Sequence, residues 1–317
     1  MEVIMDKIHA KPFIKWAGGK RQLLSQFDDL YPNKLKTNNI KRYIEAFIGG
    51  GAVFFELISR YDFEEVILND INKDLILSYI VIKHNVEELI MELRALKNQF
   101  MSLEQEQQSE MFYNIRKNFN LNKHKVDYDT AINTAELCSE HILQASYFLF
   151  LNKTCFNGLY RENRSGEFNV PFGKYKNPSI LDEDNMRNVN KALKNVTLKC
   201  GDFTKLLPFI DENTFVYMDP PYRPLNVTSS FKSYSKGDFN DEDQKRLAEW
   251  FKEASTTGAC LMLSNSNPKN TNSDDNFFEE LYKGFNIIEV FASRAINSKA
   301  SGRGAISELV IRFEKEA

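Results

Sequence analysis

The feature that most constrains the fold is an apolar run, residues 215–218, which leads directly into Asp219-Pro220-Pro221-Tyr222. Its β-prone residues predict a buried strand of a parallel sheet. Proline cannot donate to a sheet ladder, so the two prolines end this strand. The strand therefore carries a carboxylate and an aromatic ring at its carboxyl end, where open α/β sheets bind ligands. The alternative is a strand-ending turn with a solvated aspartate.

Two strand-and-turn units nearer the N-terminus predict a nucleotide-type α/β fold. The first has a strand at 43–47, the turn Gly49-Gly50-Gly51 and a helix at 52–58, so a ligand can approach the backbone of the turn. The second has a strand at 66–68 followed by Asp70. An acid at this place can accept both hydroxyls of a ribose. We expect a cofactor with an adenosine-like part, and structural packing alone is the alternative.

Two more segments fit such a site. Gly18-Gly19 precedes a helical pattern at 21–30, and together with Lys20 it can hold an anion or a carboxylate. A surface turn with solvated lysines is the alternative. A third strand, at 196–200, is followed by Asp202-Phe203, where the acid can meet an exocyclic amino group and the ring can pack on a base.

Composition limits the class of protein. The 317 residues are 42% apolar, which is enough to bury a core in one large domain or two modest ones. The net charge is -3, so a nucleic-acid partner would need a local basic patch. We expect a cytoplasmic protein without membrane contact, because no apolar run approaches the length of a membrane span and no signal peptide begins the chain. The scattered cysteines and histidines predict no metal site.

The middle of the chain is helical in pattern over 73–151, with apolar residues at three- and four-residue spacing. Within it, residues 99–125 are rich in Gln, Glu, Asn and Lys. This composition predicts either a mobile connection or a solvated helix, and we assign it no chemistry. Residues 267–276 read as a disorder-prone loop.

A basic and aromatic stretch follows at 151–178, where lysines, arginines and asparagines are interleaved with Phe and Tyr. This is the composition of a loop or hairpin that contacts phosphates, reads base edges and stacks on bases. A polar surface loop with anchoring aromatics is the alternative. A second basic loop is expected at 292–307, with Arg294, Lys299 and Arg303 suited to phosphates.

Five motifs in order give the chain a resemblance to a known family. They are F-I-K-W-A-G-G-K at 13–20, E-A-F-I-G-G-G-A at 45–52, N-D-I-N at 69–72, D-P-P-Y at 219–222 and R-G-A-I-S-E-L at 303–309. From about residue 12 to 313 the chain resembles the Dam-type DNA N6-adenine methyltransferases, and the motif order resembles that of the α group of amino-methyltransferases.

The resemblance implies a fold and its division into domains. A Rossmann-like sheet with helices on both faces, which binds S-adenosylmethionine, would occupy residues 1–75 and 195–317. A smaller, mostly helical target-recognition domain that carries a β-hairpin loop would occupy residues 76–194.

The resemblance also implies S-adenosylmethionine as cofactor, with S-adenosylhomocysteine as product. Trp16, Ala17 and Lys20 would hold the methionine end. Glu45, Phe47, Gly49 and Gly51 would line the site. Asp70 would take the ribose hydroxyls, Ile71 would pack on the adenine, and Asp202 and Phe203 would complete the adenine pocket.

The partner implied is double-stranded DNA, because segments 156–161 and 166–175 look like the recognition hairpin of members that methylate GATC. Arg161 would read a guanine, as a bidentate arginine does. Leu159 and Pro171 would contact a thymine methyl, and Lys15 and Tyr175 would serve the other flank. Phe156 would intercalate where several relatives have Tyr, Asn157 would assist flipping, and Lys153, Asn163 and Asn169 would position the backbone.

The chemistry of adenine N6 explains the residues at the strand end. An enzyme must extrude the base from the duplex, at a cost of about a few kcal/mol. Asp219 and the Pro220 carbonyl would accept the two N6 hydrogens, and Tyr222 would supply an aromatic face. These catalytic residues would stabilise the positive charge that builds on N6 during direct methyl transfer. Neither a metal nor a cysteine nucleophile is needed.

Several alternatives remain open from the sequence. D-P-P-Y suits any exocyclic amino group, so an adenine methyltransferase with another target, an N4-cytosine enzyme and an RNA-adenine enzyme are possible readings. From another class, the chain could be a DNA-binding protein with a vestigial cofactor site. A dinucleotide oxidoreductase is disfavoured because the turn is Gly49-Gly50-Gly51 and not G-x-G-x-x-G. A cognate restriction endonuclease is a possible partner, and no obligate protein partner is evident.

Overall fold

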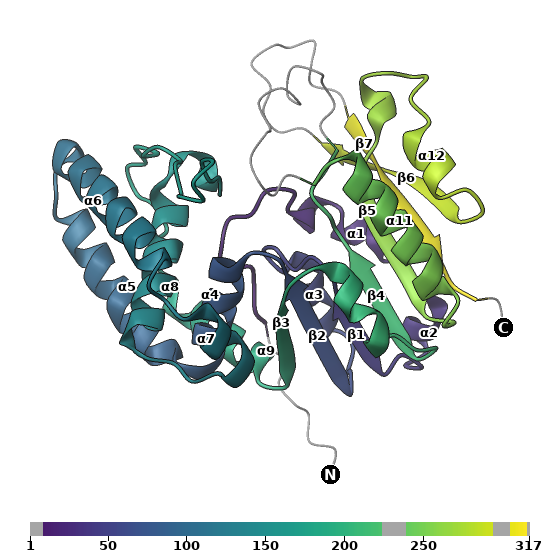
Figure 1. The fold of residues 1–317 in the computed structure, drawn as a ribbon, viewed down its shortest axis with the longest axis horizontal. Coiled ribbons are helices and arrows are strands. Elements are labelled where there is room, and N and C mark those ends of the chain that lie inside the picture. The colour runs from purple at the N-terminus through teal and green to yellow at the C-terminus, as the bar shows by residue number, and fades with distance from the viewer. Residues whose placement is uncertain (1–8, 224–238, 294–304, 316–317) are drawn as a thin grey trace. The chain divides into compact units, whose positions relative to one another are not determined.

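The computed structural model describes residues 9–223, 239–293 and 305–315. Within these residues the protein is a mixed α/β fold with one seven-stranded sheet in the order β3-β2-β1-β4-β5-β7-β6 (Figure 1). The strands are β1 Arg42–Glu45, β2 Glu65–Asp70, β3 Val196–Cys200, β4 Thr214–Met218, β5 Cys260–Ser266, β6 Asn286–Ser293 and β7 Ala305–Phe313. The α/β sheet expected from the sequence is confirmed.

Helices fill most of the rest of the described chain. The α-helices are α1 Leu24–Phe27, α2 Asn33–Lys36, α3 Ala52–Ile58, α4 Lys73–His84, α5 Val86–Met101, α6 Gln105–Lys123, α7 Tyr128–Thr134, α8 Ser139–Thr154, α9 Glu183–Leu193, α11 Asp241–Ser255 and α12 Phe277–Leu281. Short 3-10 helices are η1 Lys20–Gln22, η2 Phe156–Gly158, η3 Phe203–Phe209 and η4 Pro268–Asn270. No described helix is long and apolar enough to cross a membrane.

The chain divides into two compact units. The first unit comprises Met1–Gly19, Gly49–Arg60 and Leu68–Gly201, and the second comprises Lys20–Ile48, Tyr61–Ile67 and Asp202–Ala317. In the first unit, α4 packs against α7, α8 and α9. Each of its residues 74–82 is buried, as expected of a helix that is apolar on all sides.

The second unit is organised around parallel strands. β1 pairs with β4 and β4 pairs with β5, both in parallel register, so Glu45, Tyr217 and Met262 lie side by side. All five residues of β4 are buried, as the apolar run predicted. Leu247 and Phe251 of α11 join Val216 and Leu261 in the core of this unit. Burial of each such side chain contributes about 1.5–3 kcal/mol.

The structure decides three expectations about connecting segments. Residues 99–125 lie in α5 and α6 apart from a short turn, so a helix is right and a mobile connection is wrong. The expected disorder-prone loop at 267–276 contains η4 and is held by Asn267 Nδ2, which donates to Ser307 Oγ at 2.9 Å. Of the second basic loop expected at 292–307, residues 292–293 lie in β6 and residues 305–307 lie in β7. Its Arg294, Lys299 and Arg303 lie outside the described residues.

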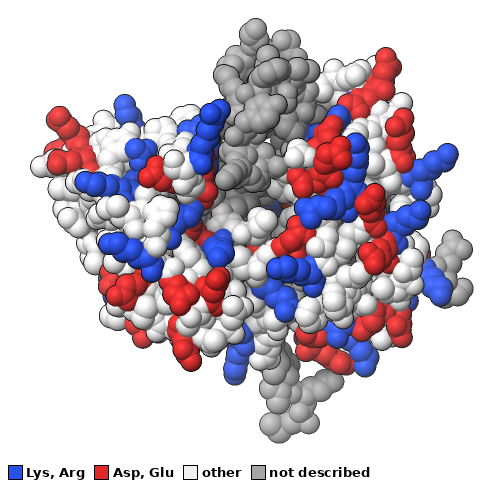
Figure 2. Space-filling model, in the orientation of Figure 1, with Lys and Arg blue, Asp and Glu red and all other residues white. Residues whose placement is uncertain are grey.

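Surface charge does not separate into large single-sign regions on the face drawn in Figure 2, where basic and acidic side chains are interspersed. This agrees with the net charge of -3. A nucleic-acid surface must therefore be argued from particular residues and their contacts.

Candidate active site and recognition hairpin

Asp219 is the first residue beyond β4, and it is the centre of a partly buried polar cluster in the second unit. Lys20 Nζ lies 2.8 Å from Asp219 Oδ1, and the Lys20 side chain is only 3% exposed. Ser264 Oγ donates to the same carboxylate oxygen at 3.3 Å and lies 2.7 Å from the hydroxyl of Tyr217. The neighbouring strands β4 and β5 thus both contribute to the position of this carboxylate.

The same cluster contains Tyr222 and a residue that the sequence did not single out, Glu308 on β7. The Tyr222 hydroxyl donates to Glu308 Oε2 at 2.5 Å. Lys20 Nζ lies 3.3 Å from that oxygen and 4.3 Å from the centroid of the Tyr222 ring, and it also donates to the Tyr222 hydroxyl. The only sequence signal for Glu308 was its place in the motif at 303–309, which by itself gave it no role.

Burial governs the protonation of this cluster. Burial raises the pKa of the Asp219 carboxyl, and the Lys20 ammonium opposes that rise. Burial, reinforced by the Asp219 charge, raises the pKa of the Tyr222 hydroxyl, so the phenol stays protonated at neutral pH. When both carboxyls are ionised, two negative charges face one positive charge. The cluster is therefore suited to a ligand in which positive charge is present or develops.

The turn after Asp219 is held from α11. Gln244 Nε2 donates to the carbonyl of Pro221 at 3.1 Å, and Asn265 Nδ2 holds Gln244 at 3.0 Å. Arg223 is fixed by Asp241 and by Asp275, each at 2.7 Å. Such anchoring holds the backbone around Pro220 in one arrangement.

Besides Lys20, four predicted cofactor residues lie in the second unit. Glu45 ends β1, is buried, and accepts a hydrogen bond from Tyr43 at 2.7 Å. The rings of Phe47 and Phe203 pack with centroids 5.5 Å apart. Asp202 caps η3 by accepting from Thr204 N at 3.0 Å.

Arg246 is a second residue that the sequence did not single out. Its Nη1 donates to Asp202 Oδ2 at 2.8 Å, and its guanidinium lies 4.9 Å from the centroid of the Phe203 ring. Burial alone would raise the pKa of Asp202, but the hydrogen bonds from Thr204 and Arg246 lower it below its usual value. Asp202 therefore remains a carboxylate that α11 orients. In the sequence, Arg246 looked like one more solvated charge of an amphipathic helix.

The other predicted cofactor residues lie in the first unit. Asp70 ends β2, where its two oxygens accept from Gly49 N at 3.1 Å and Asn72 N at 3.0 Å. Burial raises the pKa of Asp70, and these backbone donors oppose the rise. The adjacent Ile71 is 71% exposed. A carboxylate beside an exposed apolar side chain fits a ribose joined to a base.

Trp16 contacts the glycine turn closely. Gly49 has φ +46°, and a Cβ added there would lie 2.6 Å from Trp16 Cδ1, so this position requires glycine. Gly51 is also left-handed, with φ +72°, and precedes the first residue of α3. Ala17 is exposed beside Trp16. The two N-terminal motifs at 13–20 and 45–52 thus meet at the ring of Trp16.

The predicted recognition segment forms a hairpin in the first unit. Phe156 N donates to Pro171 O at 2.9 Å, and Asn169 N donates to Arg161 O at 3.1 Å. Arg161 Nε donates across the hairpin to Asn169 Oδ1 at 2.7 Å. The two expected intercalating and methyl-contacting side chains, Phe156 and Leu159, are 52% and 41% exposed. Exposed apolar side chains beside an exposed arginine fit a surface that contacts bases.

Lys15, Tyr175 and Asn157 come together at the base of this hairpin. Lys15 Nζ lies 4.6 Å from the centroid of the Tyr175 ring, and Asn157 N donates to the Tyr175 hydroxyl at 2.9 Å. Lys15 is bound through its backbone by Asn152, with bonds of 2.9 and 2.8 Å. Gly158 has φ +62°, and a Cβ there would lie 2.4 Å from Lys15 Cδ.

The two remaining predicted DNA residues differ in their surroundings. Burial lowers the pKa of Lys153 to about 8, and the Lys15 charge adds to this effect. The Asn163 side chain is used within the hairpin turn, where its Oδ1 accepts from Ser165 N and Glu167 N, each at 3.0 Å. An asparagine in such a turn looks the same in sequence as one that contacts phosphate.

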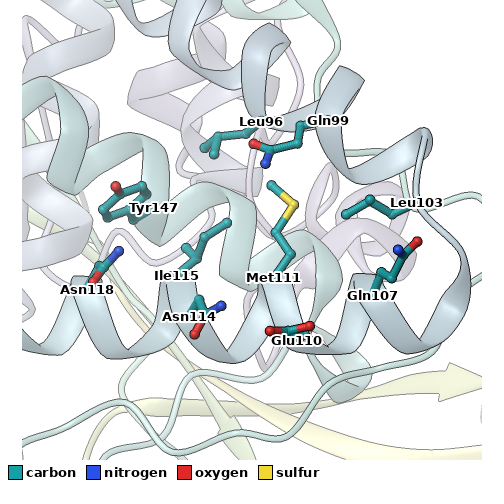
Figure 3. Close-up of a pocket in the computed structure, with 10 residues that line it drawn as sticks. All are labelled: Leu96, Gln99, Leu103, Gln107, Glu110, Met111, Asn114, Ile115, Asn118 and Tyr147. Atoms are coloured by element: carbon teal, nitrogen blue, oxygen red, sulfur yellow. The ribbon is translucent and has the colours of Figure 1, made fainter.

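A surface pocket of about 400 Å³ lies among α5, α6 and α8 (Figure 3). Leu96, Met111 and Tyr147 form part of its wall. The residues that line it include none of those predicted for catalysis, cofactor or DNA.

A sheet with a parallel core, glycine-rich turns and an acid at the end of a central strand defines an α/β enzyme whose ligands bind at the carboxyl ends of the strands. Comparison with protein families identifies the enzyme family. The chain belongs to the D12 class N6 adenine-specific DNA methyltransferases, whose family pattern it matches over residues 16–296. The predicted adenine-methyltransferase family is confirmed.

Individual relatives agree over nearly full length. The chain is 51% identical to the type II methyltransferase M.MjaIII of Methanocaldococcus jannaschii, over 96% of this chain and 99% of that protein. It is 37% identical to the type II methyltransferase M1.LlaDCHI of Lactococcus lactis subsp. cremoris, over 96% of each chain. It is 31% identical to the DNA adenine methylase of Haemophilus influenzae, over 98% of this chain and 96% of that protein.

Proposed function

We propose that the protein transfers a methyl group from S-adenosylmethionine to N6 of an adenine flipped out of double-stranded DNA, within the sequence GATC. The observation that carries the proposal is the partly buried carboxylate of Asp219, held at 2.8 Å by Lys20 at the end of β4 and followed by Tyr222. Membership of an adenine-specific family supports the choice of base.

The residues present fit S-adenosylmethionine, which supplies an electrophilic methyl group when bound. Asp70 offers a carboxylate to ribose hydroxyls, and exposed Ile71 offers an apolar face to adenine. Trp16, Ala17, Lys20, Glu45, Phe47, Gly49 and Gly51 would hold the methionine part, and Asp202 and Phe203 the purine. The negative balance of the Asp219 cluster suits a cationic sulfonium.

Three residues act on the target base. Asp219 and the carbonyl of Pro220 accept the two hydrogens of N6 and aim its lone pair at the methyl group, while Tyr222 stacks on the extruded ring. S-adenosylmethionine would supply the methyl group, and Asp219 and the Pro220 carbonyl would stabilise the positive charge that builds on N6 as it is methylated. The surplus proton of N6 then passes to Asp219, whose carboxyl has a pKa raised by burial.

The hairpin supports the target sequence in the proposal. Arg161 reads the guanine, Leu159 and Pro171 contact a thymine methyl, and Phe156 fills the space left by the flipped base. Lys15, Tyr175 and Asn157 serve the other flank, while Lys153, Asn163 and Asn169 position the phosphate backbone. We assign this recognition role to a domain at 76–194, with catalysis in residues 1–75 and 195–317.

The proposal also includes a partner protein. Two relatives are named type II methyltransferases. On that likeness we include a cognate restriction endonuclease among the proposed partners of this chain.

The test is labelled methyl transfer to a duplex that contains GATC and to the same duplex with that site altered. Incorporation at adenine in the first and little in the second is expected, and equal incorporation would exclude GATC specificity. Asp219→Ala should bind the cofactor and lose nearly all transfer. Normal transfer by Asp219→Ala would exclude the mechanism.

A further inference from the structure

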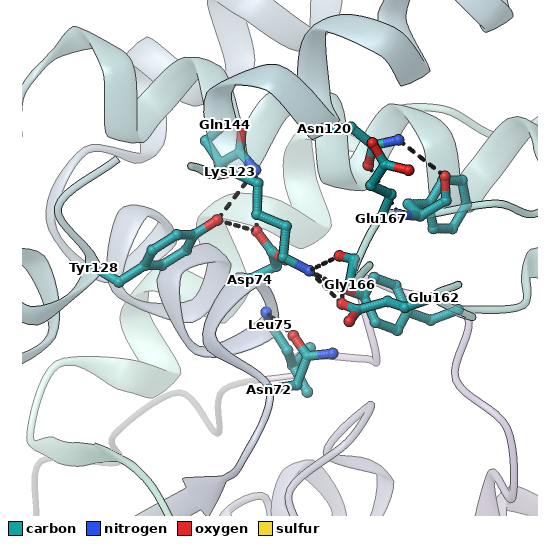
Figure 4. Close-up of polar contacts among 12 residues, drawn as sticks. Asn72, Asp74, Leu75, Asn120, Lys123, Tyr128, Gln144, Glu162, Gly166 and Glu167 are labelled. Atoms are coloured by element: carbon teal, nitrogen blue, oxygen red, sulfur yellow. Dashed lines mark hydrogen bonds and ion pairs between the residues drawn. The ribbon is translucent and has the colours of Figure 1, made fainter. Parts of the chain in front are cut away.

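A buried polar network in the first unit has no part in the proposed chemistry (Figure 4). Asp74, on the first turn of α4, is 1% exposed. Its Oδ1 accepts from the Tyr128 hydroxyl at 2.5 Å and from Gln144 Nε2 at 3.1 Å. Its Oδ2 accepts from the Tyr160 hydroxyl at 3.2 Å. A carboxylate buried to this extent needs a counter-charge.

Lys123, the last residue of α6, supplies that charge and connects α4 with the hairpin. Its Nζ lies 3.3 Å from Asp74 Oδ2 and forms an ion pair with Glu162. It also lies 3.2 Å from the Tyr160 hydroxyl and donates to the carbonyl of Gly166 at 3.1 Å. Lys123 belongs to the polar segment 99–125 that the sequence left without chemistry.

Lys123 makes one of three hydrogen bonds that form a ladder between α6 and residues 166–170, the returning segment of the hairpin. Along α6 the bonds are Arg116 Nη1 to Val170 O at 3.2 Å, Asn120 Nδ2 to Phe168 O at 3.1 Å, and Lys123 Nζ to Gly166 O at 3.1 Å. Helix residues three or four apart share a face, so Arg116, Asn120 and Lys123 can each reach a main-chain carbonyl of the returning segment 166–170. Asn120 Oδ1 also accepts from Phe168 N at 2.9 Å.

The ladder determines where Arg161 points. Tyr160 and Glu162, on either side of it, both contact Lys123. Successive side chains of an extended chain point to opposite sides, so Arg161 faces away from α6 and is exposed. Its Nε is fixed by Asn169, which lies between two anchored residues of the returning strand.

We infer that Lys123 and Asn120 are positioning residues for target recognition, which hold the hairpin so that Arg161 meets its base pair in one register. The inference rests on the proposed function, because it assumes that Arg161 reads a base. Through its contacts with Asp74, the hairpin is also fixed relative to the first turn of α4. This helix begins soon after the predicted cofactor residues Asp70 and Ile71.

The test uses the full chain and a panel of duplexes, each with one base pair of the target site changed. The site is first defined by sequencing the bases that the wild-type protein methylates. Arg161→Ala identifies the base pair that Arg161 reads. Lys123→Met and Asn120→Ala are then compared with Lys117→Met, which removes an exposed charge from the same helix.

Lys123→Met should lose discrimination at the position defined by Arg161→Ala by about tenfold or more, the scale of one arginine–guanine contact. Asn120→Ala, which leaves no buried charge unpaired, should lose discrimination at the same position. Lys117→Met should keep the wild-type profile, and cofactor affinity by equilibrium dialysis should be unchanged in all three. Wild-type discrimination by both folded variants, or an equal loss at every position, would overturn the inference.

A second measurement does not depend on methylation. Hydrogen exchange of the amides of Asn163, Gly166 and Asn169 should accelerate in Lys123→Met and not in Lys117→Met. Unchanged exchange would overturn the inference even where wild-type protein methylates DNA as proposed. Accelerated exchange in a protein that methylates no duplex would instead refute the proposed function and retain the anchoring role.

Discussion

Lys20 Nζ lies 2.8 Å from Asp219 Oδ1, so the carboxylate proposed to receive the adenine amino group already has a buried cation as its partner. The same ammonium contacts Glu308 at 3.3 Å. Lys20 therefore neutralises part of a site whose two acids would otherwise repel each other. Its charge also limits how far burial can raise the pKa of Asp219.

Replacement of Lys20 by methionine should both destabilise and inactivate the protein. Removal of one partner of a buried ion pair leaves an uncompensated charge and typically costs about 3–5 kcal/mol. Thermal unfolding and methyl transfer measure the two effects. The control is Lys41→Met, which breaks an exposed pair with Glu64 and should change the unfolding free energy by about 0–1 kcal/mol. Similar unfolding curves for both variants would contradict the role of Lys20.

Replacement of Asp219 by asparagine should abolish transfer and change how stability depends on pH, while Lys20 keeps Glu308 as its ion-pair partner. Burial raises the folded-state pKa of this acid, so the folded protein binds a proton more tightly than the unfolded chain. Stability from this group is therefore present at low pH and is lost as pH rises from the unfolded pKa through the folded one. Asparagine carries no such penalty.

The measurement for Asp219→Asn is the melting temperature of wild type and variant at about pH 5 and about pH 8, on either side of much of this titration. The melting temperature of the variant should increase relative to that of wild type as the pH rises. A variant that becomes relatively less stable at the higher pH would show that the pairing with Lys20 outweighs desolvation.

DNA affinity should fall in alkaline solution because of Lys153. Its pKa is lowered by burial to about 8, so the side chain is charged below that pH and neutral above it. Affinity for a target duplex, measured by fluorescence anisotropy, should weaken between about pH 7 and about pH 9. Lys153→Arg should flatten this dependence, since arginine stays charged. Lys174→Arg, at an exposed lysine of the same segment, should leave the decrease in place.

Gly158→Ala should impair target recognition, since the added Cβ would lie 2.4 Å from Lys15 Cδ at φ +62°. Gly284→Ala is a matched control, because Gly284 has φ +95° and open space around its Cβ position. Both changes should cost about 1 kcal/mol or more of stability, since alanine is strained at positive φ. Only Gly158→Ala should raise the KM for DNA. An equal effect on KM in both variants would remove Lys15 from the recognition surface.

The sequence predicted those parts of the molecule that depend on patterns of neighbouring residues along the chain. The buried run before Asp219 and the acid after β2 followed from strand composition and from what ends a strand. The family resemblance then pointed to the adenine-methyltransferase family. Lys123, Arg246 and Glu308 could not be found this way, because a charged residue on a polar helix or on a strand looks solvated until its distant partner is known. The partner of Lys123, Asp74, lies on a different helix, and only the folded chain brings them to 3.3 Å.

The ladder between α6 and the hairpin has a consequence for how such a protein changes over evolutionary time. Because α6 grips the hairpin largely by main-chain groups at Gly166, Phe168 and Val170, its support does not depend on which side chains the hairpin presents outward. Under the proposed function, substitutions at Arg161 or Leu159 should therefore change the sequence that is methylated, while the main-chain contacts to α6 remain. New target specificities are then expected from few mutations of the outward-facing residues of the hairpin.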